Sequence, residues 1–163
     1  MKRRVSMVIG LMAFGSLVGL SLAASPGAVP YPEGYRAWQH VKSMVIAAGH
    51  PLFASFGGIH HLYANKTAMT GYRTGTFPEG SVIVFDLLEA STADGATTEA
   101  ARKVVGVMHR NAKRFAATGG WGFEGFAGDS KAKRAVGDQA ATACFGCHTA
   151  QAQHNYVFSS YRP

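Results

Sequence analysis

The chain has 163 residues, of which 47% are hydrophobic and 15% are charged, a balance typical of one globular domain and unlike that of a disordered or fibrous chain. Its formal charge is +7, but three of the sixteen basic residues stand together at positions 2–4. The remaining basic residues are scattered and are not interleaved with aromatic side chains, so the composition does not indicate a nucleic-acid partner.

The first 24 residues have the layout of a secretory signal peptide. Three basic residues precede an apolar run that ends in small residues near Ala23, as signals for export do. The run from Val5 to Ala24 is nearly long enough to span a bilayer, so an uncleaved anchor is the alternative. Glycines interrupt the run, which favours cleavage. Cleavage lowers the formal charge to +4 and leaves one expected periplasmic domain over residues 25–163.

The first part of this domain is expected to contain a helix, a strand and a second helix. Residues 35–45 place apolar side chains three to four apart, which predicts an amphipathic helix that passes into a strand. Residues 59–64 are short, apolar and flanked by glycine and asparagine, which predicts a strand. Asn65 then caps a predicted helix over 66–72 that ends at Gly75.

Three strands and a final helix are expected in the rest of the chain. After a turn at 77–80, the β-branched segment SVIVFDLLE (81–89) is the strongest strand signal. A polar loop at 91–98 is expected to lead to a strand at 102–109, and the Gly-rich segment 119–126 alternates as a strand does. Asp129 and Ser130 are expected to cap a helix over 131–145. These elements predict an α+β fold, with four or five antiparallel strands and flanking helices.

The predicted C-terminal helix carries Cys144-Phe145-Gly146-Cys147-His148, the Cys-x-x-Cys-His signature of c-type haem attachment. Two thiols at this spacing can add to the two haem vinyl groups, and the adjacent histidine then reaches the iron as its proximal ligand. The pattern predicts one covalent haem c. A redox disulfide and part of a zinc site are the alternatives, but only two cysteines are available for four zinc ligands.

The sixth coordination position of the iron is left open by the sequence. No methionine follows the motif, which excludes a methionine ligand supplied from the C-terminal tail. An empty position is one possibility, and nine side chains are the others: His40, His50, His60, His61, His109, His154, Met44, Met69 and Met108.

Six segments, taken in order along the mature chain, resemble one known family. They read YPEGYRAW, GIHHLYAN, GYRTGTFPEGSVIVFDLLE, KRFAATGGWGFEGF, CFGCH and YVFSSYR, and they resemble the cytochrome P-460 family together with its relatives, the cytochromes c′-beta. The resemblance implies a mostly β, commonly homodimeric protein with one haem, a histidine below the iron and an open site above it. Members with a lysine bonded to the porphyrin oxidise hydroxylamine, whereas the relatives without that bond bind nitric oxide and carbon monoxide.

Three positions depart from the cross-linked pattern. In this alignment Phe85 takes the place of the cross-linking lysine, His60 that of an arginine over the haem, and Gly106 that of an acidic proton acceptor. Ile83 and Leu87 lie on the same strand face as Phe85 by the two-residue period, so Phe85 is expected to cap the iron. Lys66 is the lysine that a shifted alignment would bring to the porphyrin edge.

The resemblance and the residues together leave three functions open. The first is binding of a small gas, chiefly nitric oxide, at five-coordinate iron beneath an apolar cap. The second is oxidation of hydroxylamine or a related nitrogen compound, with His60 as proton acceptor, so it is undecided whether the protein is an enzyme. The third is electron transfer through two axial protein ligands. Each requires a redox partner protein or a small ligand.

Overall fold

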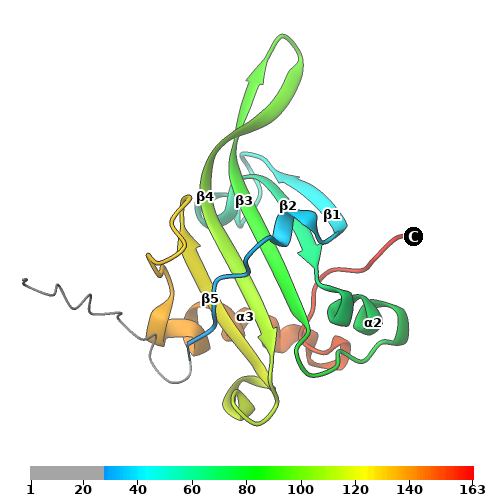
Figure 1. Cartoon of the computed structure of the whole chain (residues 1–163). Helices are drawn as coiled ribbons and strands as arrows, with labels where there is room; N and C mark the ends of the chain where they lie inside the picture. Colours follow the sequence, from blue (N-terminus) through cyan, green and yellow to red (C-terminus); the bar gives the residue numbers. More distant parts are fainter. Residues whose placement is uncertain (1–27) are drawn as a thin grey trace, which may run out of the picture.

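The computed structural model describes residues 28–163, so the predicted signal peptide at 1–24 lies outside the described residues. Five strands form one antiparallel sheet in which each strand pairs with its neighbour in the chain (Figure 1). They are β1 (Gln39–Ile46), β2 (Gly58–Ala64), β3 (Val82–Ala93), β4 (Ala96–Arg110) and β5 (Trp121–Ala127). The predicted α+β class is confirmed.

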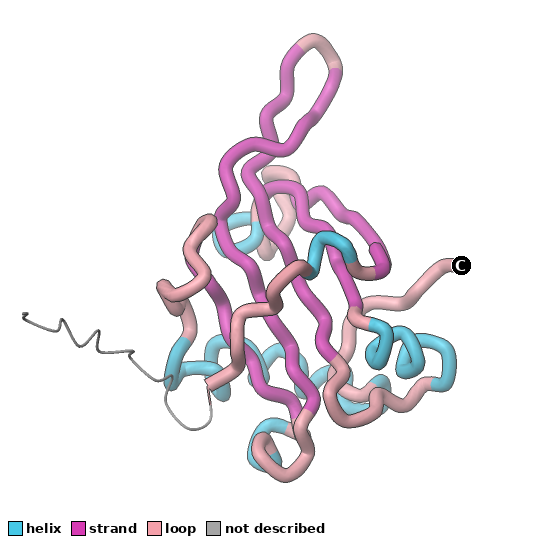
Figure 2. Tube along the Cα trace, viewed as in Figure 1, coloured by secondary structure: helices cyan, strands magenta, loops and turns pink. Residues whose placement is uncertain are grey.

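The helical segments within the described residues are short, and four of the eight follow the last strand (Figure 2). They are η1 (Tyr35–Ala37), α1 (Phe53–Phe56), α2 (Lys66–Thr74), η2 (Ala116–Thr118), η3 (Gly137–Gln139), η4 (Ala141–Phe145), α3 (Gly146–His148) and η5 (Thr149–His154). Across residues 28–163, no helix is both long and apolar enough to cross a membrane.

Successive side chains on a strand point to opposite sides of the sheet, so each face has its own core. Opposite ends of the chain cover the two faces. One face, here called the motif face, packs on α2 and the C-terminal segment. Its buried core includes Ile83, Trp121, Phe123, Met69 and Val157. The other, here called the N-terminal face, packs on the segment before β1, which crosses the front of the sheet in Figure 1. Its core includes Val84, Val105, Phe126, Val29 and Tyr35.

The helix α2 begins and ends where the sequence predicts. The Asn65 side chain accepts a hydrogen bond from the Ala68 backbone N–H at 2.8 Å and another from the Val82 N–H at 3.1 Å. It therefore caps the helix and also ties it to the start of β3. Gly75 ends the helix in the left-handed conformation, with φ of 78°, which glycine adopts without steric cost.

The polar loop predicted at 91–98 is wrong. β3 and β4 continue through this segment and project from the body as a long hairpin (Figure 1). The hairpin closes at Asp94 and Gly95, both with positive φ (51° and 77°), as an Asp-Gly two-residue turn does. Hydroxyl groups of Thr92 and Thr97 pair across the strands at 2.9 Å. The polar composition of residues 91–98 indicated a loop, but the Asp94-Gly95 dipeptide is the better predictor here, because it is typical of a two-residue hairpin turn.

Residues 35–45, predicted as a helix that passes into a strand, do pass into a strand, but the helical part is only the single turn η1. The segment continues as β1, in which the pairing register with β2 shifts between His40 and Lys42. Such a bulge inserts one extra residue into the strand. Val41 lies in the motif-face core and Trp38 packs against the N-terminal-face core, so their three-residue spacing does not mark one buried face of a helix.

The final helix starts later than predicted, because residues 131–136 are held against β5 in a non-helical conformation. The Ser130 hydroxyl accepts from the Ala132 and Lys133 N–H groups in a local turn, so it does not cap a continuing helix. The buried Glu124 carboxylate accepts from the Val136 and Gly137 N–H groups. Helical structure then begins at Gly137.

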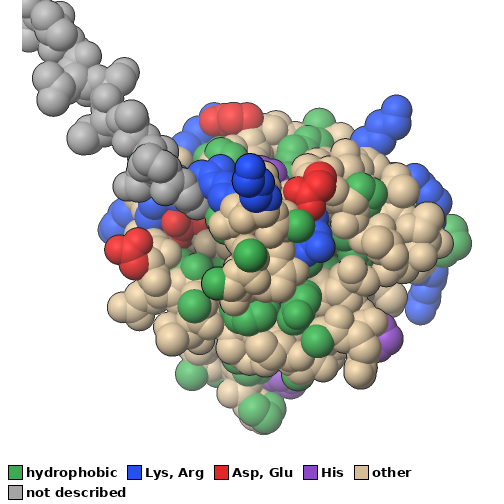
Figure 3. Space-filling model, turned by 90° about the horizontal axis from the view of Figure 1, so that it is seen from below, with side chains coloured by type: hydrophobic (Ala, Val, Ile, Leu, Met, Phe, Trp, Pro, Cys, Tyr) green, Lys and Arg blue, Asp and Glu red, His purple; other side chains and the backbone are tan. Residues whose placement is uncertain are grey.

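Charges of both signs are interspersed over the face of the molecule seen from below (Figure 3). Part of this mixing comes from ion pairs that join distant segments, such as Lys131 with Glu33. This arrangement agrees with the modest positive charge of the described residues.

Candidate functional site

The two cysteines of the motif lie on a wide helical turn beside the motif-face core. Cys144 belongs to η4, whose hydrogen bonds follow the π pattern, and Cys147 belongs to α3. Cys144 is half-buried and Cys147 is exposed, and both are free thiols. Burial raises the pKa of the Cys144 thiol, and the carboxylate of Glu124 raises it further. The raised pKa keeps the Cys144 thiol protonated at neutral pH, and neither sulfur is used in a disulfide.

His148 is oriented by a backbone carbonyl. Its Nδ1 lies 2.6 Å from the Tyr156 carbonyl oxygen, so Nδ1 carries the proton and donates it. Asn155 and Tyr156 both have positive φ (55° and 63°) and turn that carbonyl back toward α3. This bond leaves the Nε2 lone pair free, in the pattern that proteins use to fix a metal-ligating histidine.

Two aromatic rings hold the His148 imidazole in place. The ring centroids of Phe123 and Phe158 each lie 5.0 Å from that of His148. Burial lowers the pKa of His148, although the bond to Tyr156 acts in the opposite direction. The imidazole is therefore neutral near pH 7, as a ligand to iron must be.

Phe85 and His60 lie together on the motif face. Their ring centroids are 4.5 Å apart, and they come from the neighbouring strands β3 and β2. Gly106 is the register partner of Phe85 on β4, and a Cβ there would meet the Cβ of Phe85 at 3.4 Å. The absence of a side chain at Gly106 gives the Phe85 ring unhindered room on that side.

His60 is a buried polar residue with an unused nitrogen. It is only 4% exposed, and its Nδ1 has no hydrogen-bond partner. Burial, with a smaller contribution from the charge of His61, lowers the pKa of His60 to about 4. Buried polar groups without partners are rare and are concentrated at functional sites, so His60 is suited to meet a bound ligand.

Phe56 also belongs to this site, and the sequence analysis missed it. Its ring meets that of Phe85 edge-on, with centroids 5.8 Å apart and planes at 86°. It lies in α1, the turn before β2, and is 39% exposed. The only sequence signal for Phe56 was a second phenylalanine, three residues after Phe53, in a short segment bounded by proline and glycine.

The other candidate ligands are divided between the two faces. Met44 pairs in register with His60 and Met108 with Ile83, so both lie on the motif face with His60. His40 and His61 lie together on the N-terminal face, with ring centroids 6.0 Å apart. Met69 lies in the motif-face core, His109 beside Phe115, and His50 in the turn after β1.

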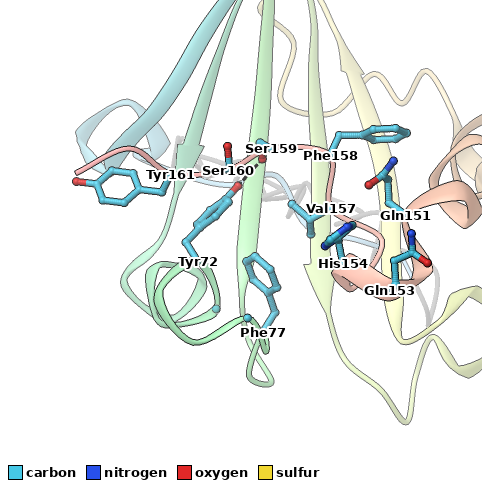
Figure 4. Close-up of a pocket in the computed structure, with 12 residues that line it drawn as sticks. Tyr72, Phe77, Gln151, Gln153, His154, Val157, Phe158, Ser159, Ser160 and Tyr161 are labelled. Carbon is cyan, nitrogen blue, oxygen red and sulfur yellow. Dashed lines mark hydrogen bonds between the residues drawn. The ribbon is translucent and has the colours of Figure 1, made fainter.

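A cavity of about 480 Å³ lies between α2 and the C-terminal segment (Figure 4). Tyr72, Phe77, His154, Val157 and Phe158 are among its lining residues. The Tyr72 hydroxyl meets the Ser159 hydroxyl at 2.7 Å and closes one wall. Phe158, which packs on His148, therefore also lines this cavity, but its walls include neither motif cysteine. A second hollow, of about 560 Å³, is lined by Lys66 and Trp38 but not by Phe85.

The family model described as Cytochrome P460 matches residues 32–159. The chain belongs to the cytochrome P460 family. No curated protein matches it in sequence. As a cytochrome of this family, it is a haem protein, and the resemblance noted from the six sequence segments is confirmed.

The residues of this cytochrome fit a haem group. His148 offers a neutral, oriented Nε2, and two free thiols adjoin it at the attachment spacing. The orphaned Nδ1 of His60 and the Phe85 ring belong to the same sheet face that packs on Cys144 and Phe145. Apolar walls with few polar groups are what a haem pocket requires.

Proposed function

We propose that this cytochrome is exported to the periplasm, carries one haem c bonded to Cys144 and Cys147 and ligated by His148, and binds nitric oxide or a similar small neutral gas at five-coordinate iron. The bound haem supplies an iron centre that can take a diatomic ligand. The protein residues bind and orient that group and control what reaches it.

The observation that carries the gas-binding proposal is the aromatic pair of Phe56 and Phe85. Two rings in edge-to-face contact at 5.8 Å form an apolar cover, which carries neither a proton donor nor a charge. Such a cover disfavours water and anions, whose desolvation is costly, and admits small neutral molecules. Phe85 also has no nitrogen with which to bond a porphyrin edge.

The surroundings of His148 hold its imidazole in the orientation that a proximal ligand needs. The bond from Nδ1 to the Tyr156 carbonyl holds the imidazole in one tautomer and makes Nε2 a stronger base. The aromatic contacts with Phe123 and Phe158 resist rotation of the ring. Together they favour a stable proximal bond.

A second candidate function is oxidation of hydroxylamine or a related nitrogen compound, and it rests on His60. A neutral imidazole with a free nitrogen, next to Phe85, can accept a proton from a bound substrate. Its low pKa makes it a weak base, and Gly106 offers no second acceptor. Gas binding is therefore the preferred function.

The covalent attachment is tested by mass spectrometry of the denatured mature protein. We expect the mass of one haem above that of the polypeptide, lost when Cys144 and Cys147 are both replaced by Ser. Release of all haem on denaturation of the unaltered protein would contradict the attachment.

The role of His148 is tested by comparing His148→Ala with His154→Ala, since both histidines lie on the same C-terminal segment. We expect His148→Ala to retain covalent haem but to lose the normal iron spectrum, whereas His154→Ala leaves the spectrum unchanged. An unchanged spectrum in His148→Ala would assign the iron to another ligand.

A further inference from the structure

A second cluster of ligating side chains lies on the N-terminal face, where the edge strand β1 pairs with β2. The Ser43 hydroxyl oxygen lies 2.9 Å from Nε2 of His40 and 2.6 Å from Nδ1 of His61. Ser43 and His61 are directly opposite each other in the strand register. Two imidazole nitrogens from two strands therefore converge on one oxygen atom.

The far side of the His61 ring faces a carboxylate. Nε2 of His61 lies 2.6 Å from Oε1 of Glu99, although its N–H does not point straight at that oxygen. Glu99 is 40% exposed and can rotate into line. A carboxylate here keeps the proton on Nε2, so Nδ1 presents its lone pair toward Ser43. This carboxylate–histidine arrangement is the one that orients ligating histidines at metal sites.

The cluster is accessible to an ion from solvent. His40 and Ser43 are exposed, and the His61 side chain is 17% exposed. Metal–nitrogen bonds of about 2.0–2.1 Å are shorter than these hydrogen bonds, so an ion held by both nitrogens requires the rings and the Ser43 side chain to shift. His40, on the exposed edge strand next to a bulge, is free to make this adjustment.

The site is open rather than closed. Within residues 28–163, no three His, Cys, Asp or Glu side chains converge on a single point, so the ion would have two protein nitrogens and complete its shell with Ser43 and water. Imidazole ligands suit copper, zinc and nickel, and Cu²⁺ binds such donors more tightly than the other divalent ions of its row. Arg36, 3.6 Å from Glu99, opposes a cation, but its charge is also shared with the buried Asp86 at 3.3 Å.

We propose that His40 and His61 form an exchangeable surface site for one divalent transition-metal ion, with Cu²⁺ bound more tightly than Zn²⁺ and with Glu99 positioning His61. The site lies on the opposite side of the sheet from His60 and Phe85. It does not depend on the gas-binding proposal.

The test is calorimetric titration of the mature haem-loaded protein with Cu²⁺ and, separately, with Zn²⁺. We expect one ion per chain, lost in His40→Ala and in His61→Ala. Glu99→Gln should weaken binding by about tenfold, the lower end for loss of a carboxylate that orients a ligating histidine. His50→Ala and His154→Ala, at exposed histidines elsewhere, should bind as the unaltered protein does.

Electron paramagnetic resonance of bound Cu²⁺ provides a second readout, in which two nitrogen couplings are expected. An unchanged haem absorption spectrum in each variant shows that it is folded. The proposal is overturned if the unaltered protein binds no ion, or if binding survives both His40→Ala and His61→Ala.

Discussion

Phe85 determines what reaches the iron in our account. It is half-buried and is contacted by Phe56 on one side and His60 on the other. The sequence alone was enough to propose Phe85 for this role, because the strand period and the family pattern agree at that position. Phe56 could not be found in this way, since it comes from a turn whose path depends on how β1 and β2 pair.

Replacing Phe85 by Ala should open the pocket. We expect water to bind the ferric iron and carbon monoxide to enter on the order of tenfold faster, as for a barrier lowered by about 1.4 kcal/mol. Stopped-flow absorption measures the rate. Phe56→Ala should act in the same direction, and Phe53→Ala, at an exposed ring of the same turn, is the control. If carbon monoxide entered Phe85→Ala and Phe56→Ala no faster than it enters Phe53→Ala, the two rings would not cover the iron.

Burial of His60 in its neutral form should make stability depend on pH. Its pKa is about 4 in the folded protein and about 6.5 when unfolded. Between these values the unfolded chain holds the extra proton, so the free energy of unfolding falls as the pH is lowered from about 6.5 toward 4. The loss approaches about 3 kcal/mol at most.

Urea unfolding at several pH values, comparing the unaltered protein with His60→Gln, isolates this effect. The variant lacks the titrating group, so its stability should fall less steeply with acid over the same interval. Parallel pH profiles for the two proteins would mean that His60 is not held neutral.

At the scale of elements, the segment between β5 and the haem-attachment motif depends on Glu124. Burial alone raises the pKa of Glu124, but Arg134 and the N–H groups of Gly125, Val136 and Gly137 more than offset this, and the net pKa is lowered. The carboxylate is 2.7 Å from the Arg134 guanidinium. One buried side chain therefore fixes the point from which the motif helix starts.

Glu124→Gln removes the charge but keeps the size, and leaves Arg134 without its ion-pair partner. We expect a loss of about 2–4 kcal/mol in the free energy of unfolding, measured by urea denaturation. The exposed Glu89 is a matched control, and Glu89→Gln should stay within about 0.5 kcal/mol of the unaltered protein. Equal stabilities for the two variants would contradict the role of Glu124.

The same elements show what sequence patterns could and could not predict. The cap at Asn65, the strand over 81–89 and the Gly-rich strand were predictable, because each depends on local chemistry or a two-residue period. The start of the last helix was not, because the Glu124 carboxylate recruits backbone N–H groups twelve and thirteen residues away. Contacts of that range leave no local sequence signal.

At the scale of the whole molecule, the two faces of one sheet carry different chemistry. The motif face combines the C-terminal motif with His60, Phe85 and Phe56, whereas the N-terminal face holds the pair of His40 and His61. The first site could be proposed from the sequence, since the Cys-x-x-Cys-His spacing stands in five consecutive residues. The second site joins residues on two strands, and it emerges only from the register of β1 and β2.

The central claim is that the iron has one protein ligand and an open, apolar sixth position. Its most direct test is the absorption spectrum of the purified ferrous protein before and after addition of nitric oxide. Our account predicts an ordinary haem c spectrum with five-coordinate, high-spin features that change when one equivalent of gas binds. A six-coordinate, low-spin ferrous spectrum that nitric oxide leaves unaltered would contradict it.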